Sequence, residues 1–348
     1  MKKSLAILIA FTLVILTLGG CGTPAGTTSS KQQPPQQSTN GQLSQPINIK
    51  IATQDVGSAW YNYGAAFSDA LSKNLPKGSS VDVLPYTGGI GNVKLVGTGE
   101  AQLGLTFAPM GKWGYEGKVA YKEKYGDLRA LVGGLDQYYL ATVARADVPM
   151  NSWKDIKTKK IALRINTQPN GSTAAYAQDL LFEAAGISRN DILDNGGSIT
   201  ATSTDVITGN IKDGRADLLI QPVVAGHPAV TDISISTKIK FIPYEDDVVD
   251  YLVKNYGFSA ATLPAGSFKG QDQAVKMAGF PTILIANKEL SDEAAYAITK
   301  ILCENADVFN KTVGGLKNFN PEKGALNVGG LPLHPGAEKY YKEKGWLK

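Results

Sequence analysis

The sequence predicts an α/β protein of two lobes, each a mixed sheet flanked by helices, with a cleft between them. From Ile47 onward, apolar runs with strand spacing alternate with runs of helical spacing, and this alternation is typical of an α/β sheet. The same order of elements then occurs a second time after residue 160. The roughly 300 residues of this body also suit two cores better than one.

The first pass of the alternation occupies residues 47–145. Helices are expected over residues 60–71 and from a glycine-rich turn at 87–92 to about residue 96. A helix on the surface of a lobe is the simplest interpretation of residues 115–125, where tyrosines occur among lysines. The predicted strands span residues 47–52, 81–85, 102–107, 128–133 and 139–145.

The second pass repeats the pattern closely enough to favour two similarly wound lobes. Residues 99–105 and 214–220 both read as a Gly-x-Ala turn followed by an apolar strand. Two apolar strands that precede polar turns, residues 141–147 and 282–290, could be the crossings between the lobes. The first lobe would then combine residues 47–140 and 288–348, and the second would hold residues 141–287. Further strands are predicted at 161–165 and 217–221, and further helices at 172–185, 205–212, 248–254 and 294–309.

The start of the chain has the pattern of an export signal. Lys2 and Lys3 precede an apolar run over residues 5–18, which is shorter than the ~20 residues that span a bilayer. The run ends in Leu18-Gly19-Gly20-Cys21, which resembles the lipobox of bacterial lipoproteins. This resemblance implies that residues 1–20 are a signal peptide and that a lipid on Cys21 anchors the protein to the cell membrane, outside the cytoplasm. An uncleaved anchor or an ordinary signal peptide is the alternative.

Residues 21–46 predict a lipidated, disordered tether, because they are rich in Gly, Thr, Pro, Ser and Gln and contain no aromatic residue. The formal charge of +4 falls to +2 without Lys2 and Lys3, and the absence of a long basic run gives no indication of nucleic-acid binding. Cys303 is the one cysteine after Cys21 and fits a small core residue.

Enzymatic function is disfavoured by what the sequence does not contain. Its two histidines are far apart and no cysteine pair follows Cys21, so neither a zinc site nor another cofactor is expected. The Gly-Ser turns lack the GxSxG spacing of a nucleophile elbow. We therefore expect a binding protein rather than an enzyme.

Two late segments resemble one known family of binding proteins. Residues 263–272 read LPAGSFKGQD and residues 331–341 read LPLHPGAEKYY, and both are similar to segments of TAXI-type solute-binding proteins. Thr87-Gly88-Gly89 followed by Asn92 matches the Thr-Gly-Gly turn of that family. The resemblance implies a type II periplasmic-binding-protein fold and a small carboxylate-bearing solute, such as glutamate or an oxo- or dicarboxylate. It also implies a partner, a TRAP-type membrane permease driven by an ion gradient.

Three polar, glycine-containing turns each precede a predicted helix, and a helix N-terminus favours anions. In the first turn, the resemblance makes Ser58 and Tyr61 polar contacts and lets Gly57 approach the solute closely. Asp55 departs from the family pattern. It could pair with an ammonium group of the solute or cap the helix, and both remain open.

The second turn could form a backbone nest for an anion or be a plain helix start. It lacks the GxGxxG pattern, so a nucleotide is not expected. The third turn matches the family loop in part, and its Ser172 is also a good N-cap. The candidate residues are Thr87, Gly89, Gly91 and Asn92 in the second turn and Asn170, Gly171, Ser172 and Thr173 in the third.

Two side chains on predicted strands complete the candidate site. Arg164 precedes the third turn, where its guanidinium could clamp a carboxylate or lie on a solvent-facing surface. Gln221 ends a strand at a position similar to the family's cleft-lining segment and could hydrogen-bond a solute. The neighbouring His227 is expected to pack beside Pro228.

Taken together, the sequence predicts a lipid-anchored, monomeric receptor that captures a small solute and delivers it to a TRAP-type permease. A lipoprotein that senses the solute for a signalling partner is one alternative. An ABC-type receptor of similar fold and an exported enzyme are two others.

Overall fold

The computed structural model describes residues 43–348. The predicted signal peptide, Cys21 and the tether up to residue 42 lie outside the described residues. Leu43 is half-buried against the core, and Pro46 lies 3.4 Å from where a Cβ on Gly78 would stand. The described packing therefore includes Leu43, four residues before the predicted start of the body at Ile47.

The described strands form one mixed sheet of eleven strands in the order β2-β1-β3-β11-β5-β8-β6-β7, with β4 and β10 also paired to β11 and β9 to β5. Each lobe takes part of this sheet. Lobe 1 contains β1 (Asn48–Ala52), β2 (Ser80–Leu84), β3 (Leu103–Phe107) and β4 (Leu128–Val132). Lobe 2 contains β5 (Gln137–Arg145), β6 (Arg164–Thr167), β7 (Ser198–Ala201), β8 (Leu218–Val223), β9 (Ile239–Phe241) and β10 (Ser259–Leu263).

The long strand β11 (Val275–Asn287) belongs to both lobes. Its first half pairs with β10 and with β5 as far as Pro281, and its second half pairs with β3 and β4 from Thr282 onward. The other crossing lies between β4 and β5, at residues 133–136. The prediction that residues 141–147 form this crossing is therefore wrong, since they pair with β8 and β9 inside lobe 2 or follow that pairing.

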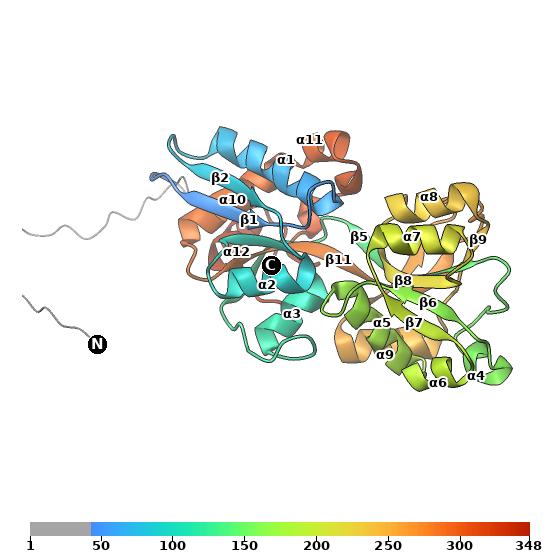
Figure 1. Cartoon of the computed structure of the whole chain (residues 1–348). Helices are drawn as coiled ribbons and strands as arrows, with labels where there is room; N and C mark the ends of the chain where they lie inside the picture. Colours follow the sequence, from blue (N-terminus) through green and yellow to red (C-terminus); the bar gives the residue numbers. More distant parts are fainter. Residues whose placement is uncertain (1–42) are drawn as a thin grey trace, which may run out of the picture. The chain divides into compact units, whose positions relative to one another are not determined.

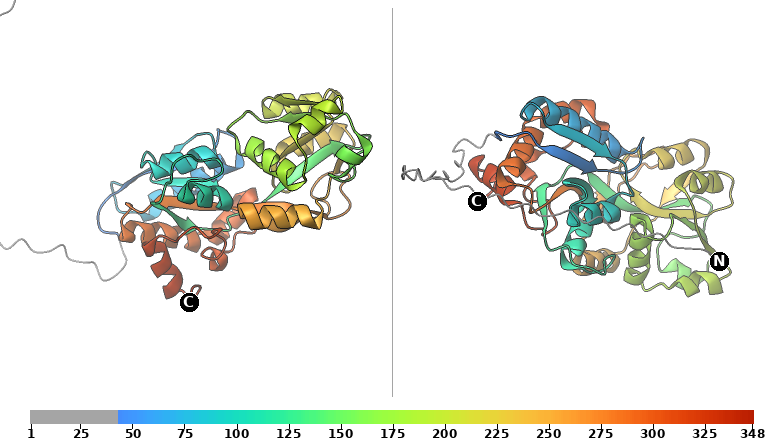
Figure 2. Two further views of the ribbon diagram at one scale, coloured as in Figure 1. Left: turned by 90° about the horizontal axis from the view of Figure 1, so that it is seen from below. Right: turned by 60° about the vertical axis from the view of Figure 1, so that its left-hand side comes forward.

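Helices cover the sheet in each lobe, and elements from both ends of the body lie together in lobe 1 (Figures 1 and 2). The helices of lobe 1 are α1 (Ala59–Asn74), α2 (Gly89–Gly97), α3 (Ala108–Glu116), α10 (Asp292–Glu304), α11 (Ala306–Thr312) and α12 (Pro335–Glu343). Those of lobe 2 are α4 (Asp155–Lys159), α5 (Thr173–Ala184), α6 (Arg189–Asp194), α7 (Thr204–Lys212), α8 (Pro228–Ser236) and α9 (Asp246–Tyr256). Two short 3₁₀ helices, η1 (Gly314–Leu316) and η2 (Pro321–Lys323), connect α11 to α12.

Two helix predictions need correction. The helix expected over residues 115–125 is absent from the described chain, because α3 ends at Glu116 and Gly117 takes the left-handed conformation that terminates helices. The helical stretch over 294–309 is two helices that meet at Asn305. No helix within residues 43–348 is long and apolar enough to cross a membrane.

The order of the elements follows from local sequence and from burial. All five residues of β3 are buried, which its largely apolar sequence predicts for a central strand. In α1, Trp60, Tyr63, Phe67 and Leu71 recur at helical spacing and all face the core. Burying each such large side chain contributes roughly 1.5–3 kcal/mol, and these contacts fix where the helix starts lie.

Candidate functional site

The first and third turns begin their helices with serine caps. Ser58 Oγ accepts a hydrogen bond of 3.1 Å from Tyr61 N at the start of α1. Ser172 Oγ accepts one of 3.2 Å from Ala175 N at the start of α5. Both serines therefore satisfy a helix N–H group, as the preference of serine for the N-cap position predicts.

The start of α2 is different, because it is buried and lacks a capping side chain from any described residue. The N-cap is Gly88, and the first hydrogen bond of the helix runs from Asn92 N to Gly88 O at 2.8 Å. Thr106 Oγ1, from β3, donates to Gly89 O at 3.0 Å and so connects the turn to the sheet. The N–H groups of the first turn are thus left for a further acceptor, and a buried helix end without partners indicates a binding position.

Asn92 holds this turn in place. Its Nδ2 donates to the carbonyl oxygens of Thr53 and Leu105, both at 2.8 Å, and also to that of Ala52 at 3.2 Å. The carbonyls of Ala52 and Thr53 lie at the end of β1, and that of Leu105 lies in the middle of β3. The amide hydrogens of Asn92 therefore bind the α2 start to the sheet, and a direct contact of this side chain with solute stays a prediction for its Oδ1 alone.

The second and third turns meet across the two lobes. A Cβ atom built on Gly89 would lie 3.1 Å from Thr173 Oγ1 at the start of α5 and 3.6 Å from the ring of Phe107. Gly89 belongs to lobe 1 and Thr173 to lobe 2. The lobes are therefore closed at this point, with two helix N-termini beside each other.

Lobe 2 adds buried polar side chains near the ends of β6 and β8. Gln221 is 2% exposed, and its Oε1 accepts from Gln168 Nε2 at 3.3 Å. Its Nε2 has no hydrogen-bond partner among the described residues, and Thr167 Oγ1 has none either. Because an unsatisfied buried polar group costs about 1–3 kcal/mol, these atoms indicate where a polar ligand would bind.

The sequence interpretation missed Thr167 and Gln168, which flank the third turn on its strand side. Gln168 also donates to Thr204 Oγ1 at 3.1 Å and so connects the third turn to the start of α7. The signal that could have identified them is their place at the carboxyl end of a parallel strand, where α/β sheets bind ligands.

An aromatic cluster fills the space between the lobes behind these turns. The ring centroid of Phe107 lies 4.7 Å from that of Trp60, 4.9 Å from Tyr138 and 4.5 Å from Phe280. Trp60 Nε1 donates to Thr282 Oγ1 at 3.2 Å. The cluster joins α1 and β3 of lobe 1 to the two strands at the crossings, β5 and β11. It therefore connects the two lobes beside the turns.

The other predicted residues lie on more open parts of the turns. A Cβ on Gly91 would overlap Thr87 Oγ1, so the threonine side chain lies over this glycine. The backbones of Gly57 and Gly171 have φ angles of 90° and 88°, which glycine adopts without strain. Contact of these residues with a solute stays a prediction, as it does for the half-buried Tyr61 and for the exposed Asp55 and Asn170.

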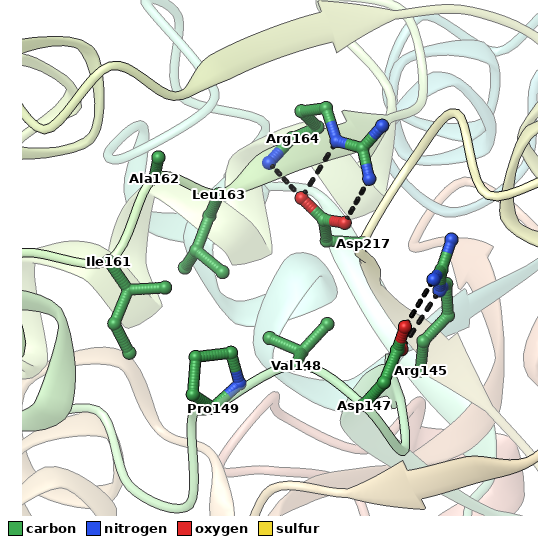
Figure 3. Close-up of a pocket in the computed structure, with 9 residues that line it drawn as sticks. All are labelled: Arg145, Asp147, Val148, Pro149, Ile161, Ala162, Leu163, Arg164 and Asp217. Carbon is green, nitrogen blue, oxygen red and sulfur yellow. Dashed lines mark hydrogen bonds and ion pairs between the residues drawn. The ribbon is translucent and has the colours of Figure 1, made fainter.

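Arg164 does not join the candidate site. It begins β6, whereas the third turn follows Thr167 at the other end of this short strand. Its Nε donates to Asp217 Oδ2 at 3.0 Å, and a second bond joins its guanidinium to Asp217 Oδ1 (Figure 3). The guanidinium is therefore occupied by a protein carboxylate, and its predicted role as a clamp for the solute is not supported.

A small cavity of about 230 Å³ lies beside this ion pair. Its second arginine, Arg145, pairs with Asp147 (Figure 3). Each cation of this cavity has its own acid, so the cavity offers no free charge to a ligand.

A much larger cavity of about 1190 Å³ lies between the lobes at their crossings. Its lining includes Asp136, Tyr139, Ser259, Pro281 and Lys317. None of the solute-site residues predicted from the described part of the sequence lines it. The helix start of α2 and Gln221 Nε2 have hydrogen-bond donors without a partner among the described residues, and these donors lie outside the cavity lining.

His227, one of the two histidines of the body, and Cys303 both have pKa values that burial shifts. His227 lies at the N-cap of α8, before Pro228, and burial lowers its pKa to about 4. Burial raises the pKa of the Cys303 thiol to about 12. Within residues 43–348, no group of three or more His, Cys, Asp or Glu side chains is placed to hold a metal ion.

Comparison with known proteins places this geometry in a family. Residues 51–345 match the NMT1-like family. Among solved structures, MatC from Rhodopseudomonas palustris with bound malate is similar with a TM-score of 0.50 and 15% identity, over 86% of this chain and 98% of that chain. The periplasmic aliphatic sulphonate binding protein SsuA from Escherichia coli gives 0.45 and 13%, over 86% and 84%. A TctC solute binding protein from Polaromonas gives 0.46 and 14%, over 87% and 99%. The predicted fold class, a two-lobed periplasmic-binding-protein fold, is confirmed.

Proposed function

Because the chain belongs to the NMT1-like family, we propose that it is an extracytoplasmic receptor that captures a small solute between its lobes and delivers it to a membrane transporter. One observation carries this proposal. The buried, uncapped start of α2 lies against the start of α5 from the other lobe, at Gly89 and Thr173. A solute bound there would contact both lobes, so binding would stabilise the closed form.

The chemistry of the site favours a solute that bears a carboxylate. The free N–H groups and the partial positive charge of the α2 start attract an anion. Gln221 contributes Nε2 as a further donor, since its Oε1 already accepts from Gln168. A solute with acceptor groups at both ends, such as an oxo- or dicarboxylate or glutamate, would satisfy donors of both lobes.

The finer identity of the transport system rests on sequence motifs. The segments at 263–272 and 331–341 resemble TAXI-type receptors, so we propose a TRAP-type permease as the partner. The Cys21 motif supports lipid anchoring to the cell membrane, and it lies outside the described residues. Lobe limits close to 47–140 with 288–348 and 141–287 are likewise proposed, with the crossings moved to residues 133–136 and to Pro281–Thr282, where strand pairing changes.

A thermal-shift panel tests the proposal directly. The panel holds L-glutamate, 2-oxoglutarate, malate, an alkanesulfonate and methylphosphonate, so that carboxylates compete with other oxyanions. A carboxylate present at about 100 times its Kd should add about 2.7 kcal/mol to the free energy of unfolding. No stabilisation by any solute would remove the receptor proposal, and stabilisation only by the sulfonate or phosphonate would remove the carboxylate class.

A variant pair tests the position of the site. Gln221→Met removes the unpartnered donor and keeps the side-chain length, so it should abolish most of the shift. Ser188→Ala, at the exposed N-cap of α6 and outside the three turns, serves as the control and should retain it. Equal shifts in both variants would exclude Gln221 from the site.

A further inference from the structure

Three cationic side chains of lobe 1 surround one tyrosine near the end of α3. Lys112 Nζ lies 5.4 Å from the ring centroid of Tyr115, Lys124 Nζ lies 5.8 Å from it, and the guanidinium carbon of Arg129 lies 5.9 Å from it. The face of an aromatic ring attracts cations at this range, so the ring stabilises three charges that repel one another. We call residues 112–129 the basic segment.

The basic segment carries a positive charge that the rest of the body lacks. The described body holds 32 basic and 31 acidic residues, because Lys2, Lys3 and Lys31 of the 35 basic residues precede it. The segment alone holds five basic and three acidic residues, so its charge of +2 leaves −1 for the remainder of the body. These residues are Lys112, Lys118, Lys122, Lys124 and Arg129 against Glu116, Glu123 and Asp127.

Ion pairs within the segment leave cations free. Glu116 is shared between Lys112, at 3.1 Å, and Lys118. Lys122 and Lys124 are exposed and form no ion pair with any residue of the described body. The segment therefore presents unpaired positive charge to the solvent.

The loop that carries these lysines also exposes an apolar side chain. Val119 is 38% exposed and has a φ angle of 58°, which a β-branched residue rarely adopts. The loop is held against α2, because Tyr121 Oη donates to Ile90 O at 3.2 Å and the ring of Tyr121 packs edge-on against that of Tyr125. An apolar group among lysines on a fixed loop is typical of a surface that binds at a membrane interface.

Strand register places the basic segment at the edge of the sheet where the chain enters the body. Arg129 and Leu103 both pair with Ala286, and Leu103 also pairs with Ile51. The strand β1 begins before this level, at Asn48. The first and second turns follow the other ends of β1 and β2, so they lie at the opposite edge of the lobe 1 sheet.

We propose that the basic segment is a binding site for the anionic phospholipid headgroups of the membrane that Cys21 anchors the protein to. Lobe 1 then rests on that membrane with the first and second turns directed to the solution. Binding of headgroups depends on the segment alone. Its use in the cell rests on the proposed extracytoplasmic, anchored function.

An extended anionic surface fits the segment better than a single small anion does. The exposed lysines lie along a loop and do not converge on one point, whereas a charged membrane attracts every cation that comes close to it. A tether would keep the body near the membrane, so a weak attraction per cation is sufficient. The solute site then stays open to solution, and delivery to a permease requires the body to turn.

Co-sedimentation with vesicles tests the site. The protein is residues 22–348, which contain the whole packed body and lack Cys21, so no lipid on the chain carries it to the membrane. It should bind vesicles of phosphatidylglycerol and phosphatidylcholine, release them as salt rises, and ignore pure phosphatidylcholine. Lys122→Gln combined with Lys124→Gln should weaken binding roughly 25-fold, since each cation near such a surface contributes about fivefold.

The matched control is Lys238→Gln combined with Lys254→Gln, which removes the same charge from two exposed lysines of lobe 2 and should bind as the wild type does. Equal losses in the two double variants would mean that only net charge acts, and would overturn the site. Absence of binding to the anionic vesicles, or equal binding to the neutral ones, would overturn it as well.

Acetylation of lysines, read by mass spectrometry, tests the orientation. Anionic vesicles should protect Lys122 and Lys124 and leave Lys238 and Lys254 reactive. Equal protection of all four would contradict the proposed orientation.

The solute panel decides the receptor function separately. The Lys122→Gln and Lys124→Gln variant should show the thermal shift of the wild type, because the segment lies at the other edge of the sheet. If no solute binds while anionic vesicles do, the receptor function fails and the headgroup site stands. If solute binds while the vesicles do not, only the headgroup site fails.

Discussion

Gly89 has a hydrogen atom where any other amino acid would have its Cβ atom. Gly89→Ala would put Cβ 3.1 Å from Thr173 Oγ1 of the other lobe, so the two helix starts must separate by a few tenths of an ångström. We predict that solute affinity falls about tenfold, or about 1.4 kcal/mol. The unliganded protein should keep its stability within about 1 kcal/mol, because alanine favours the helix. Titration and thermal unfolding of the same variant give both numbers.

The control for this substitution is Gly209→Ala in α7. Nothing lies within 4 Å of its Cβ position, so alanine should stabilise the helix by roughly 0.5–1 kcal/mol and leave solute affinity unchanged. A similar loss of affinity in both variants would contradict the assignment of Gly89 to the closed contact.

A substitution of Arg164 tests whether its guanidinium binds the solute. Arg164→Met removes the ion pair with Asp217, in which the arginine side chain is 46% exposed, so the cost should be about 1 kcal/mol of stability. Solute affinity should stay within twofold of the wild type. If the guanidinium clamped the solute, the substitution would instead lower the solute affinity about 100-fold. Isothermal titration separates the two results.

Asp136 predicts a specific pH dependence. Its pKa is raised from 3.8 to about 6, so the folded protein holds this proton more tightly than the unfolded chain does. The stabilisation by the protonated form is present at low pH and is lost as the pH rises from about 4 through about 6. Asp136→Asn should remove this fall, which for one proton has a limiting slope of about 1.4 kcal/mol per pH unit. Parallel stability curves of wild type and variant between pH 4 and pH 7 would show that the group does not titrate in this way.

At the scale of the element, local rules predicted the helix starts. Ser58 and Ser172 precede apolar helical runs, and both are N-caps in the structure. The alternation of strand and helix also predicted the α/β class, because each element carries its own periodicity. Gly117 shows where such rules were overlooked, since a glycine after Glu116 already indicated the end of α3.

Interactions between distant elements could not be predicted in this way. The partner of Arg164 is Asp217, 53 residues later, and no local pattern joins them. The place of the crossings depends on which strands β11 pairs with, and an apolar strand does not specify its neighbours. The unpartnered atoms of Thr167 and Gln221 appear only once the surrounding hydrogen bonds are known.

At the scale of the whole molecule, the two lobes share one strand, β11, and a continuous core. The aromatic cluster around Phe107 contains residues of α1, β3, β5 and β11. We therefore predict that chemical unfolding is a single transition, seen at the same denaturant concentration by far-UV circular dichroism and by tryptophan fluorescence. Trp113 in lobe 1 and Trp153 in lobe 2 are both buried and report on each lobe. Two separated transitions would mean that the lobes unfold independently.

The position of the shared strand β11 late in the sequence also affects when the two lobes can fold during synthesis. Neither lobe can complete its sheet before residues 275–287 exist, because these residues pair with β3 and β4 on one side and with β5 and β10 on the other. About four-fifths of the polypeptide is therefore synthesised before β11, and the edges of the strands that pair with β11 stay unpaired until then. Unpaired edges are prone to aggregate. A chain that ends before β11 should accumulate as insoluble material rather than as one finished lobe.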